Sequence, residues 1–167
     1  TLLFGDCLCS ALMQKFKFSK ERFKIFHPGG SIGQTLLLVK DVMLKGKKLP
    51  LINYKSNILK AIQTISKKDL GLGIVIKNKF VIGVVTDGDI RRGAKKFSKK
   101  NKITTLMTKK PIYTSESIPA SKALSVMSEK KITTLLVSSD KDFKKNKAYF
   151  KPVGILHIHS LLKYGIK

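Results

Sequence analysis

Apolar residues recur along the chain with two different spacings, which predict helices in some segments and strands in others. The helical spacing is clear over Ile58–Ser66, where apolar residues return every three or four positions. The same spacing predicts a helix over Ala120–Glu129. Short β-rich apolar runs predict strands over Gly73–Ile76 and Phe80–Val85.

The other elements expected from this pattern fall into three kinds, namely short extended segments, strands and closing helices. They are extended segments around Leu51–Ile52 and Ile112–Tyr113, strands over Thr134–Val137 and Val153–Leu156, and helices near Asp87–Arg92 and His159–Lys163.

The order of these elements repeats, and so do parts of the sequence. Asp41-Val42-Met43 returns 64 residues later as Thr105-Leu106-Met107, and Gly83 returns 71 residues later as Gly154. Lys60-Ala61-Ile62 returns 62 residues later as Lys122-Ala123-Leu124, so the offset grows from 62 to 71. This increase of nine places an insertion in the Lys- and Asp-rich segment Ser138–Lys151. We therefore predict an α/β (α+β) fold built from two β-α-β-β-α copies. Copies of about 60 residues are too small to bury their sheets alone, so they should pack against each other.

A further helix is predicted near the start of the chain, where Leu8, Leu12 and Phe16 follow helical spacing. Cys7 and Cys9 are two positions apart, so on a helix they point to nearly opposite faces and cannot share a metal ion. We expect both to be buried thiols.

A loop rich in glycine follows this helix at Phe26–Gly33. His27 at its mouth could act as a general acid or base near neutral pH. The backbone N–H groups of Gly29, Gly30 and Ser31 suit a phosphate. The alternative is a tight turn with a packed histidine, and residue chemistry alone favours that alternative.

Net charge sets this chain apart, because 34 Lys and Arg face only 10 Asp and Glu, giving +24. Only three of the 34 are Arg, and the lysines are spread along the chain, so a solvated basic surface is favoured over a nucleic-acid interface. We therefore expect small anionic ligands rather than nucleic acid. No apolar run has the length of a membrane span, and no secretory signal is present, so we expect no membrane partner and a cytoplasmic location.

His157 and His159 are two apart in a β-rich run, so we expect them to share a face. Two such imidazoles can bind a metal, but a third ligand is missing nearby in the sequence. We expect packing or site-lining roles for this pair, and neither a metal nor a cofactor.

The duplicated pattern resembles a tandem CBS-domain pair, and Gly83-Val84-Val85-Thr86-Asp87-Gly88-Asp89 resembles the family signature. The resemblance implies that Thr86 contacts a nucleotide phosphate and that Asp89 holds the ribose hydroxyls, with Asp87 beside them. In the second copy His157 stands where Thr is usual and Ser160 where Asp is usual. His157 and His159 are therefore candidates for an atypical second site. A nucleotide or sugar nucleotide would be the effector, and the alternative is a purely structural or oligomerising pair.

The chain also resembles the arabinose-5-phosphate isomerases, in which a sugar-isomerase (SIS) domain precedes two CBS domains. The resemblance rests on five motifs that occur in the same order, namely Gly5-Asp6, His27-Pro28-Gly29-Gly30-Ser31-Ile32-Gly33, Asp41-Val42-Met43, residues 86–92 and residues 154–159. It implies that residues 1–39 are the C-terminal remnant of an SIS domain, residues 40–99 the first CBS domain and residues 100–167 the second.

In that family the histidine of the His-Pro-Gly-Gly motif belongs to the active site, so the resemblance implies a catalytic role for His27 in an intact parent. The parent would interconvert ribulose 5-phosphate and arabinose 5-phosphate for lipopolysaccharide (Kdo) synthesis, as a homodimer or homotetramer. We expect this chain alone to be inactive. The alternative is a free-standing CBS-pair sensor that regulates a partner, for which the His-Pro-Gly-Gly motif would have no use.

Overall fold

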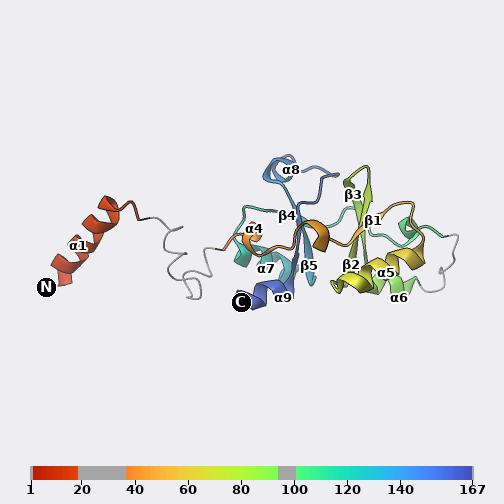
Figure 1. Cartoon of the computed structure of the whole chain (residues 1–167), viewed down its shortest axis with the longest axis horizontal. Coiled ribbons are helices and arrows are strands. Elements are labelled where there is room, and N and C mark those ends of the chain that lie inside the picture. The colour runs from red at the N-terminus through yellow and green to blue at the C-terminus, as the bar shows by residue number, and fades with distance from the viewer. Residues whose placement is uncertain (1, 19–36, 94–100, 167) are drawn as a thin grey trace.

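The computed structural model describes residues 2–18, 37–93 and 101–166, and it contains both predicted copies (Figure 1). The first copy comprises β1 (Leu51–Asn53), α5 (Ile58–Lys68), β2 (Leu72–Lys77), β3 (Phe80–Thr86) and α6 (Asp87–Arg92). The second comprises β4 (Tyr113–Ser115), α7 (Ala120–Glu129), β5 (Thr134–Ser138), β6 (Gly154–His157) and α9 (Ile158–Lys163). The predicted β-α-β-β-α duplication is confirmed.

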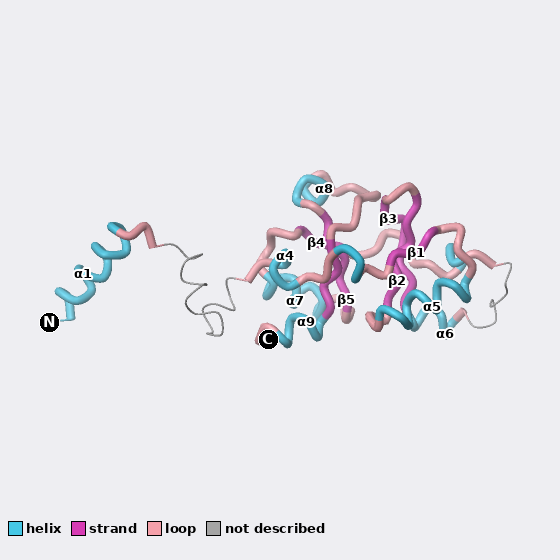
Figure 2. Tube along the Cα trace, viewed as in Figure 1, coloured by secondary structure: helices cyan, strands magenta, loops and turns pink. Residues whose placement is uncertain are grey.

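Each copy forms its own three-stranded sheet, in the order β1-β2-β3 or β4-β5-β6. The first two strands of each sheet are parallel, and the last two form an antiparallel pair. The nine-residue insertion lies in the β5–β6 connection and contains a short helix, α8 (Asp140–Lys144), where a loop is expected. Figure 2 shows α8 on the opposite side of the strands from α5, α6, α7 and α9.

Helix α5 shows how the sequence pattern becomes packing. Asn57 caps its first turn, with the side-chain oxygen accepting a hydrogen bond from the backbone N–H of Lys60 at 2.9 Å. Ile58, Ala61 and Ile65 form its buried face. These are residues of the predicted apolar stripe, and they pack with Val75 and Val85 of the sheet.

The two copies share a hydrophobic core, as predicted. Ile74 and Val84 of the first copy pack in one buried cluster with Leu136 and Ile155 of the second. Phe150, at the end of the insertion, is 1% exposed and belongs to the same cluster. Neither sheet therefore buries its apolar face alone.

The copies also exchange the segments that lead into them. Leu44 precedes the first copy but pairs with Ile155 of the second, through N···O hydrogen bonds of 2.8 and 3.0 Å. Thr108 precedes the second copy but pairs with Val84 of the first, through hydrogen bonds of 2.8 and 3.0 Å. Short helix α4 (Val39–Val42) extends this arrangement, because Val39 and Val42 pack in the core of the second copy.

Helix α1 (Leu2–Lys15) is the predicted N-terminal helix, and it contributes no buried residue. Figure 1 draws it apart from the two sheets. Leu8, Leu12 and Phe16 are 42–60% exposed, and Cys7 and Cys9 are free and exposed. The expectation of buried thiols is wrong, because no apolar surface of the described chain covers this helix. No helix within residues 2–18, 37–93 and 101–166 combines the length and hydropathy needed to span a bilayer.

Candidate nucleotide site

The candidate site lies where β3 ends and α6 begins, and Thr86 is its pivot. Thr86 is the N-cap of α6, and its hydroxyl accepts a hydrogen bond from the backbone N–H of Asp89 at 3.2 Å. In return, Asp89 Oδ2 accepts from the Thr86 backbone N–H at 2.9 Å and from the Thr86 hydroxyl at 2.8 Å. This reciprocal capping box fixes both side chains that the sequence singled out.

Arg92 adds a third interaction, which the sequence analysis did not identify. Its guanidinium donates to Asp89 Oδ1 at 2.6 Å, so both carboxylate oxygens have protein partners. Burial raises the pKa of the Asp89 carboxyl, but hydrogen bonds from Thr86 and Arg92 and the Arg92 charge outweigh it. The pKa is therefore below its ordinary value, and Asp89 is ionised at neutral pH.

Two cavities flank Thr86. One, of about 480 Å³, is lined by Asp87, Gly88 and Arg91 of α6 and by Lys131–Thr134 of the second copy. The other, of about 280 Å³, is lined by Asp89 and Arg92, by Thr108 and Lys110–Ile112, and again by second-copy residues. Thr86 lines both cavities, Asp87 only the first and Asp89 only the second, so the three predicted residues surround a cleft in two parts that both copies build.

Thr108, Lys110 and Pro111 were missed as part of the site. They border the cleft because Thr108 pairs with Val84 of the edge strand β3. Gly83 allows this approach, since a Cβ atom there would lie 2.7 Å from the Thr108 carbonyl oxygen. The return of Asp41-Val42-Met43 as Thr105-Leu106-Met107 was the available signal, because it marks the two segments that the copies exchange.

The second copy offers different chemistry at the equivalent position. His157 is the N-cap of α9, and its Nδ1 accepts a hydrogen bond from the backbone N–H of His159 at 3.3 Å. The imidazole therefore performs the capping role of Thr86, without a carboxylate in return. Burial, followed by the neighbouring His159, lowers the pKa of His157, while Asp69 opposes this effect. A neutral, capping imidazole is the form this position favours.

The rings of His157 and His159 do lie together, with centroids 5.0 Å apart. The expected reason is wrong, because His157 ends β6 and His159 belongs to α9, so they share no strand face. Neither lines the two cavities beside Thr86. The described residues contain no group of three or more His, Cys, Asp or Glu that could hold a metal ion. His27, Gly29, Gly30 and Ser31 lie outside the described residues.

Comparison with known proteins assigns the repeat. The family profile "CBS domain" matches residues 39–96 and 103–167. The chain is 35% identical over 170 residues to an arabinose 5-phosphate isomerase KdsD of Francisella tularensis and 34% identical to that of Yersinia pestis. These alignments cover 99–100% of this chain and 49–50% of each relative, so the chain spans about half their length.

Solved structures give the same fold. CBSX2 in complex with AMP has a TM-score of 0.62 at 23% identity, covering 77% of this chain and 95% of that one. The CBS domain pair of MJ0100, in complex with 5-methylthioadenosine and S-adenosyl-L-methionine, has a TM-score of 0.60 at 24% identity, with coverages of 77% and 94%. At these identities the likeness establishes the fold alone.

Proposed function

The chain belongs to the CBS-domain family, and we propose that its Thr86–Asp89 cleft binds an adenine nucleotide and makes the pair a regulatory module. The observation that carries this proposal is the ionised Asp89, fixed by Thr86 at the mouth of a cleft built by both copies. The relatives support the ligand class, since CBSX2 and MJ0100 were solved with AMP and with adenosine derivatives.

The chemistry of the cleft suits each part of such a ligand. A carboxylate accepts two hydrogen bonds from a ribose diol, and Asp89 supplies it. The Thr86 hydroxyl and the lysine and arginine side chains around the cleft would contact the phosphate. Ile112, Ile132 and Leu136 provide apolar surface for the base.

Binding in this mode requires Arg92 to release Asp89 Oδ1 and the Thr86 hydroxyl to turn its hydrogen from Asp89 Oδ2 toward the phosphate. The Arg92 side chain is 75% exposed, so its ion pair contributes little and is easily exchanged for a ligand hydroxyl. Arg92 would then be free to face the phosphate. The second copy lacks this arrangement, since His157 and Ser160 replace the threonine and the aspartate, so we propose one ordinary nucleotide site per chain.

We further propose that the chain is the regulatory part of an arabinose-5-phosphate isomerase. Identities of 34–35% over the whole chain to the KdsD proteins support this assignment. Residues 1–39 would then end the SIS domain, residues 40–99 and 100–167 would be the CBS domains, and the complete protein would be a cytoplasmic homodimer or homotetramer. His27 would serve as its acid–base group, and the N–H groups of Gly29, Gly30 and Ser31 would face the phosphate of the sugar substrate.

In that protein the nucleotide would shift the equilibrium between arrangements of the CBS pairs and so tune isomerase activity. The reaction, ribulose 5-phosphate to arabinose 5-phosphate, supplies lipopolysaccharide (Kdo) synthesis. This chain alone would not catalyse it. A free-standing CBS-pair sensor is the alternative function, and the His-Pro-Gly-Gly motif argues against it.

Calorimetric titration of AMP tests the nucleotide site. We expect saturable binding with one Asp89-dependent site per chain, weakened at least tenfold by Asp89→Asn. Asp69→Asn is the matched control, because it removes the same charge at a left-handed position, with φ of 51°, that Asn tolerates. Equal affinities in the two variants would refute the site. A parallel titration with a sugar nucleotide distinguishes the two effector classes.

An isomerase assay tests the parent function. Ribulose 5-phosphate conversion is measured for this chain and for the chain joined to its upstream coding sequence. Activity in the longer protein alone, lost in His27→Ala, supports the proposal. No activity in either protein would favour the free-standing sensor.

A further inference from the structure

A cavity of about 590 Å³ lies at the other end of β3 and shares only Lys110 with the cleft beside Thr86. Its lining includes Phe80 and Ile82 near the start of β3, three residues of the exchanged segment (Met107, Lys109 and Lys110), and Ala148 and Tyr149 of the insertion. Thr86 and Asp89 take no part in it. Its volume falls within the range typical of small-molecule sites, which is roughly 300–1,000 Å³.

The walls of this cavity combine exposed aromatic rings with positive charge. Phe80 is 47% exposed and Tyr149 is 62% exposed, and large rings left in water at one place favour a ligand that covers them. Ile82 and Met107 add apolar surface. Lys77, Lys109 and Lys110 also line the cavity, and none of its described lining residues is acidic.

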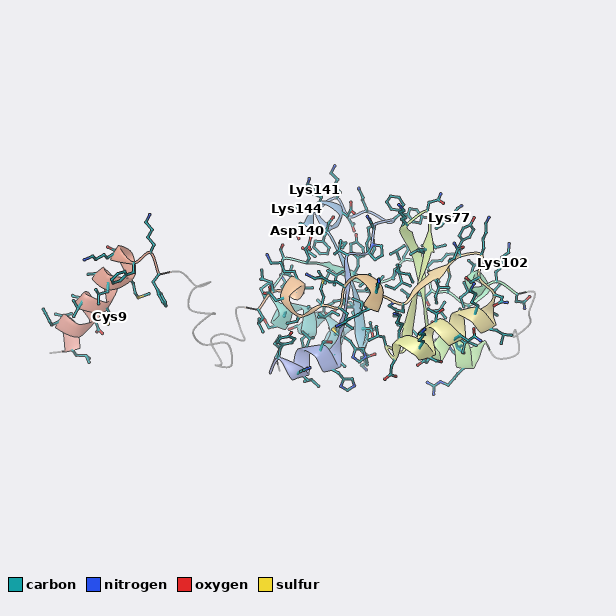
Figure 3. The ribbon with its side chains drawn as sticks, viewed as in Figure 1. Cys9, Lys77, Lys102, Asp140, Lys141 and Lys144 are labelled. Carbon is teal, nitrogen blue, oxygen red and sulfur yellow. The ribbon has the colours of Figure 1, made fainter. Side chains whose placement is uncertain are left out.

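Of these lysines, Lys109 is the best candidate to bind an anion in this cavity. The Lys77 ammonium lies 5.4 Å from the centre of the Tyr54 ring, so part of its charge is already engaged. Lys110 lines both this cavity and the cleft beside Asp89, and it therefore cannot separate the two sites in an experiment. Figure 3 shows Lys77 on the hairpin, at the end of the strands away from α6.

The aromatic wall is held in place rather than projecting freely. The Val81 N–H donates to the Phe150 carbonyl at 2.9 Å. This hydrogen bond holds the backbone before Phe150, which carries Tyr149, near the backbone before Val81, which carries Phe80. Phe150 is buried against Tyr113, with ring centroids 4.3 Å apart. The Tyr113 hydroxyl also donates to the Lys147 carbonyl at 3.1 Å. The nine-residue insertion thus builds one wall of a preformed cavity.

The opposite wall is fixed by the exchanged segment. The backbone N–H and carbonyl of Thr108 both form hydrogen bonds with Val84. These bonds place Met107 and Lys109 beside β3. Met107 packs with the core of the first copy. Because the walls come from three separate segments, each with its own anchor, little ordering would be needed on binding.

We propose that this cavity is a second ligand site, for a small molecule that joins a flat ring to an anionic group such as a phosphate ester. The ring would lie against Phe80 and Tyr149, where stacking and burial stabilise it. The anion would face Lys109, in the strongly positive field of a chain of net charge +24.

Three probes separate these contributions in titrations of the whole chain. 1-Naphthyl phosphate carries both features, inorganic phosphate carries only the charge, and 1-naphthol carries only the ring. We expect 1-naphthyl phosphate to bind saturably, with an affinity at least tenfold above either fragment. The 1-naphthol titration also measures how much of the binding is adsorption to exposed apolar side chains, such as those of helix α1.

Matched substitutions then place the probe. Lys109→Glu should weaken binding at least tenfold and Tyr149→Ala at least fivefold. The controls Lys122→Glu and Tyr164→Ala change the same residue types at exposed positions away from the cavity, and should leave the affinity unchanged. Near-ultraviolet circular dichroism verifies that each variant is folded.

Asp89→Asn distinguishes this site from the proposed nucleotide site, and should not affect the probe. The proposal is overturned if 1-naphthyl phosphate binds no better than its fragments, if the controls weaken it as much as Lys109→Glu, or if Asp89→Asn abolishes binding. Its failure would leave the Asp89-dependent binding of AMP unaffected, because the two sites share only Lys110.

Discussion

The Met43 side chain occupies the space that a Cβ atom on Gly154 would need. Met43 precedes the first copy, whereas Gly154 begins the last strand of the second. The same relationship recurs between Met107 and Gly83, where a Cβ atom would lie 3.0 Å from the Met107 sulfur. The two signature glycines are thus required by the packing of the exchanged segments.

Gly154→Ala should destabilise the protein by about 1–3 kcal/mol, because the added methyl overlaps a buried side chain and lies near the Leu44 carbonyl. Urea unfolding measures the loss. The cost should shrink in a Met43→Ala background, since the overlapping side chain is gone. Gly5→Ala is the control, because nothing lies within 4 Å of its Cβ position. Additive effects of the two substitutions would contradict the contact.

Asp89→Asn should lower stability at pH 7 by about 1 kcal/mol, through the weakened capping box. The pKa of Asp89 is lowered in the folded protein, so its contribution is present above pH ~3.9 and is lost as pH falls through the folded pKa. The gap between wild type and variant should therefore close below pH ~4. Unfolding free energies from pH 6 to 2.5 test this, and a gap of constant size would contradict it.

His157 should make stability depend on pH in a less acidic range than Asp89 does. Because burial and His159 lower its pKa in the folded state, its stabilising effect is present above the unfolded pKa of about 6.5. That effect is lost as pH falls from there toward the folded pKa. The slope should be smaller in His157→Gln, and the other histidines remain in both proteins. Equal slopes would show that His157 is not desolvated.

His159→Gln tests the same pair by a different measurement. Removing the neighbouring imidazole should raise the pKa of His157 toward its ordinary value, since His159 is one cause of the lowering. Titration of the His157 ring proton by NMR reports this directly. An unchanged pKa would mean that burial alone accounts for the shift.

Substitutions in α1 and α4 should differ sharply in cost. Leu8→Ala with Leu12→Ala should change stability by less than about 0.5 kcal/mol, because both side chains are substantially exposed. Val39→Ala, at a fully buried position in the core of the second copy, should cost about 2 kcal/mol. Chemical denaturation of both variants suffices. A comparable loss in the α1 variant would show that this helix is covered in solution.

The repeat and its elements could be predicted because local patterns decide them. The stripe of α5 and the apolar runs of β2 and β3 are properties of neighbouring residues, and the Thr86 cap lies three residues from its partner Asp89. The interaction with Arg92 was missed, although it lies within the same helix, because the spacing allows an ion pair between Asp87 and Arg91 equally well.

Long-range exchange was harder to predict. Nothing local to Leu44 or Thr108 indicates that each pairs with the copy it does not lead into. The exposure of Cys7 and Cys9 depends on what packs against α1, which helical spacing does not determine. The short helix α8 begins at a serine cap, Ser139, inside a segment whose charge had indicated a loop.

The exchange of entry segments has a consequence for how such a chain could have arisen. In a molecule with one copy, the entry segment would have no sheet edge to pair with, and the sheet edge would have no entry segment. Two such molecules would pair both by swapping their entry segments. Joining two such subunits end to end would convert an intermolecular swap into the pairings of Leu44 with Ile155 and Thr108 with Val84. The duplicated chain is, in this sense, a symmetric domain-swapped dimer held in one polypeptide.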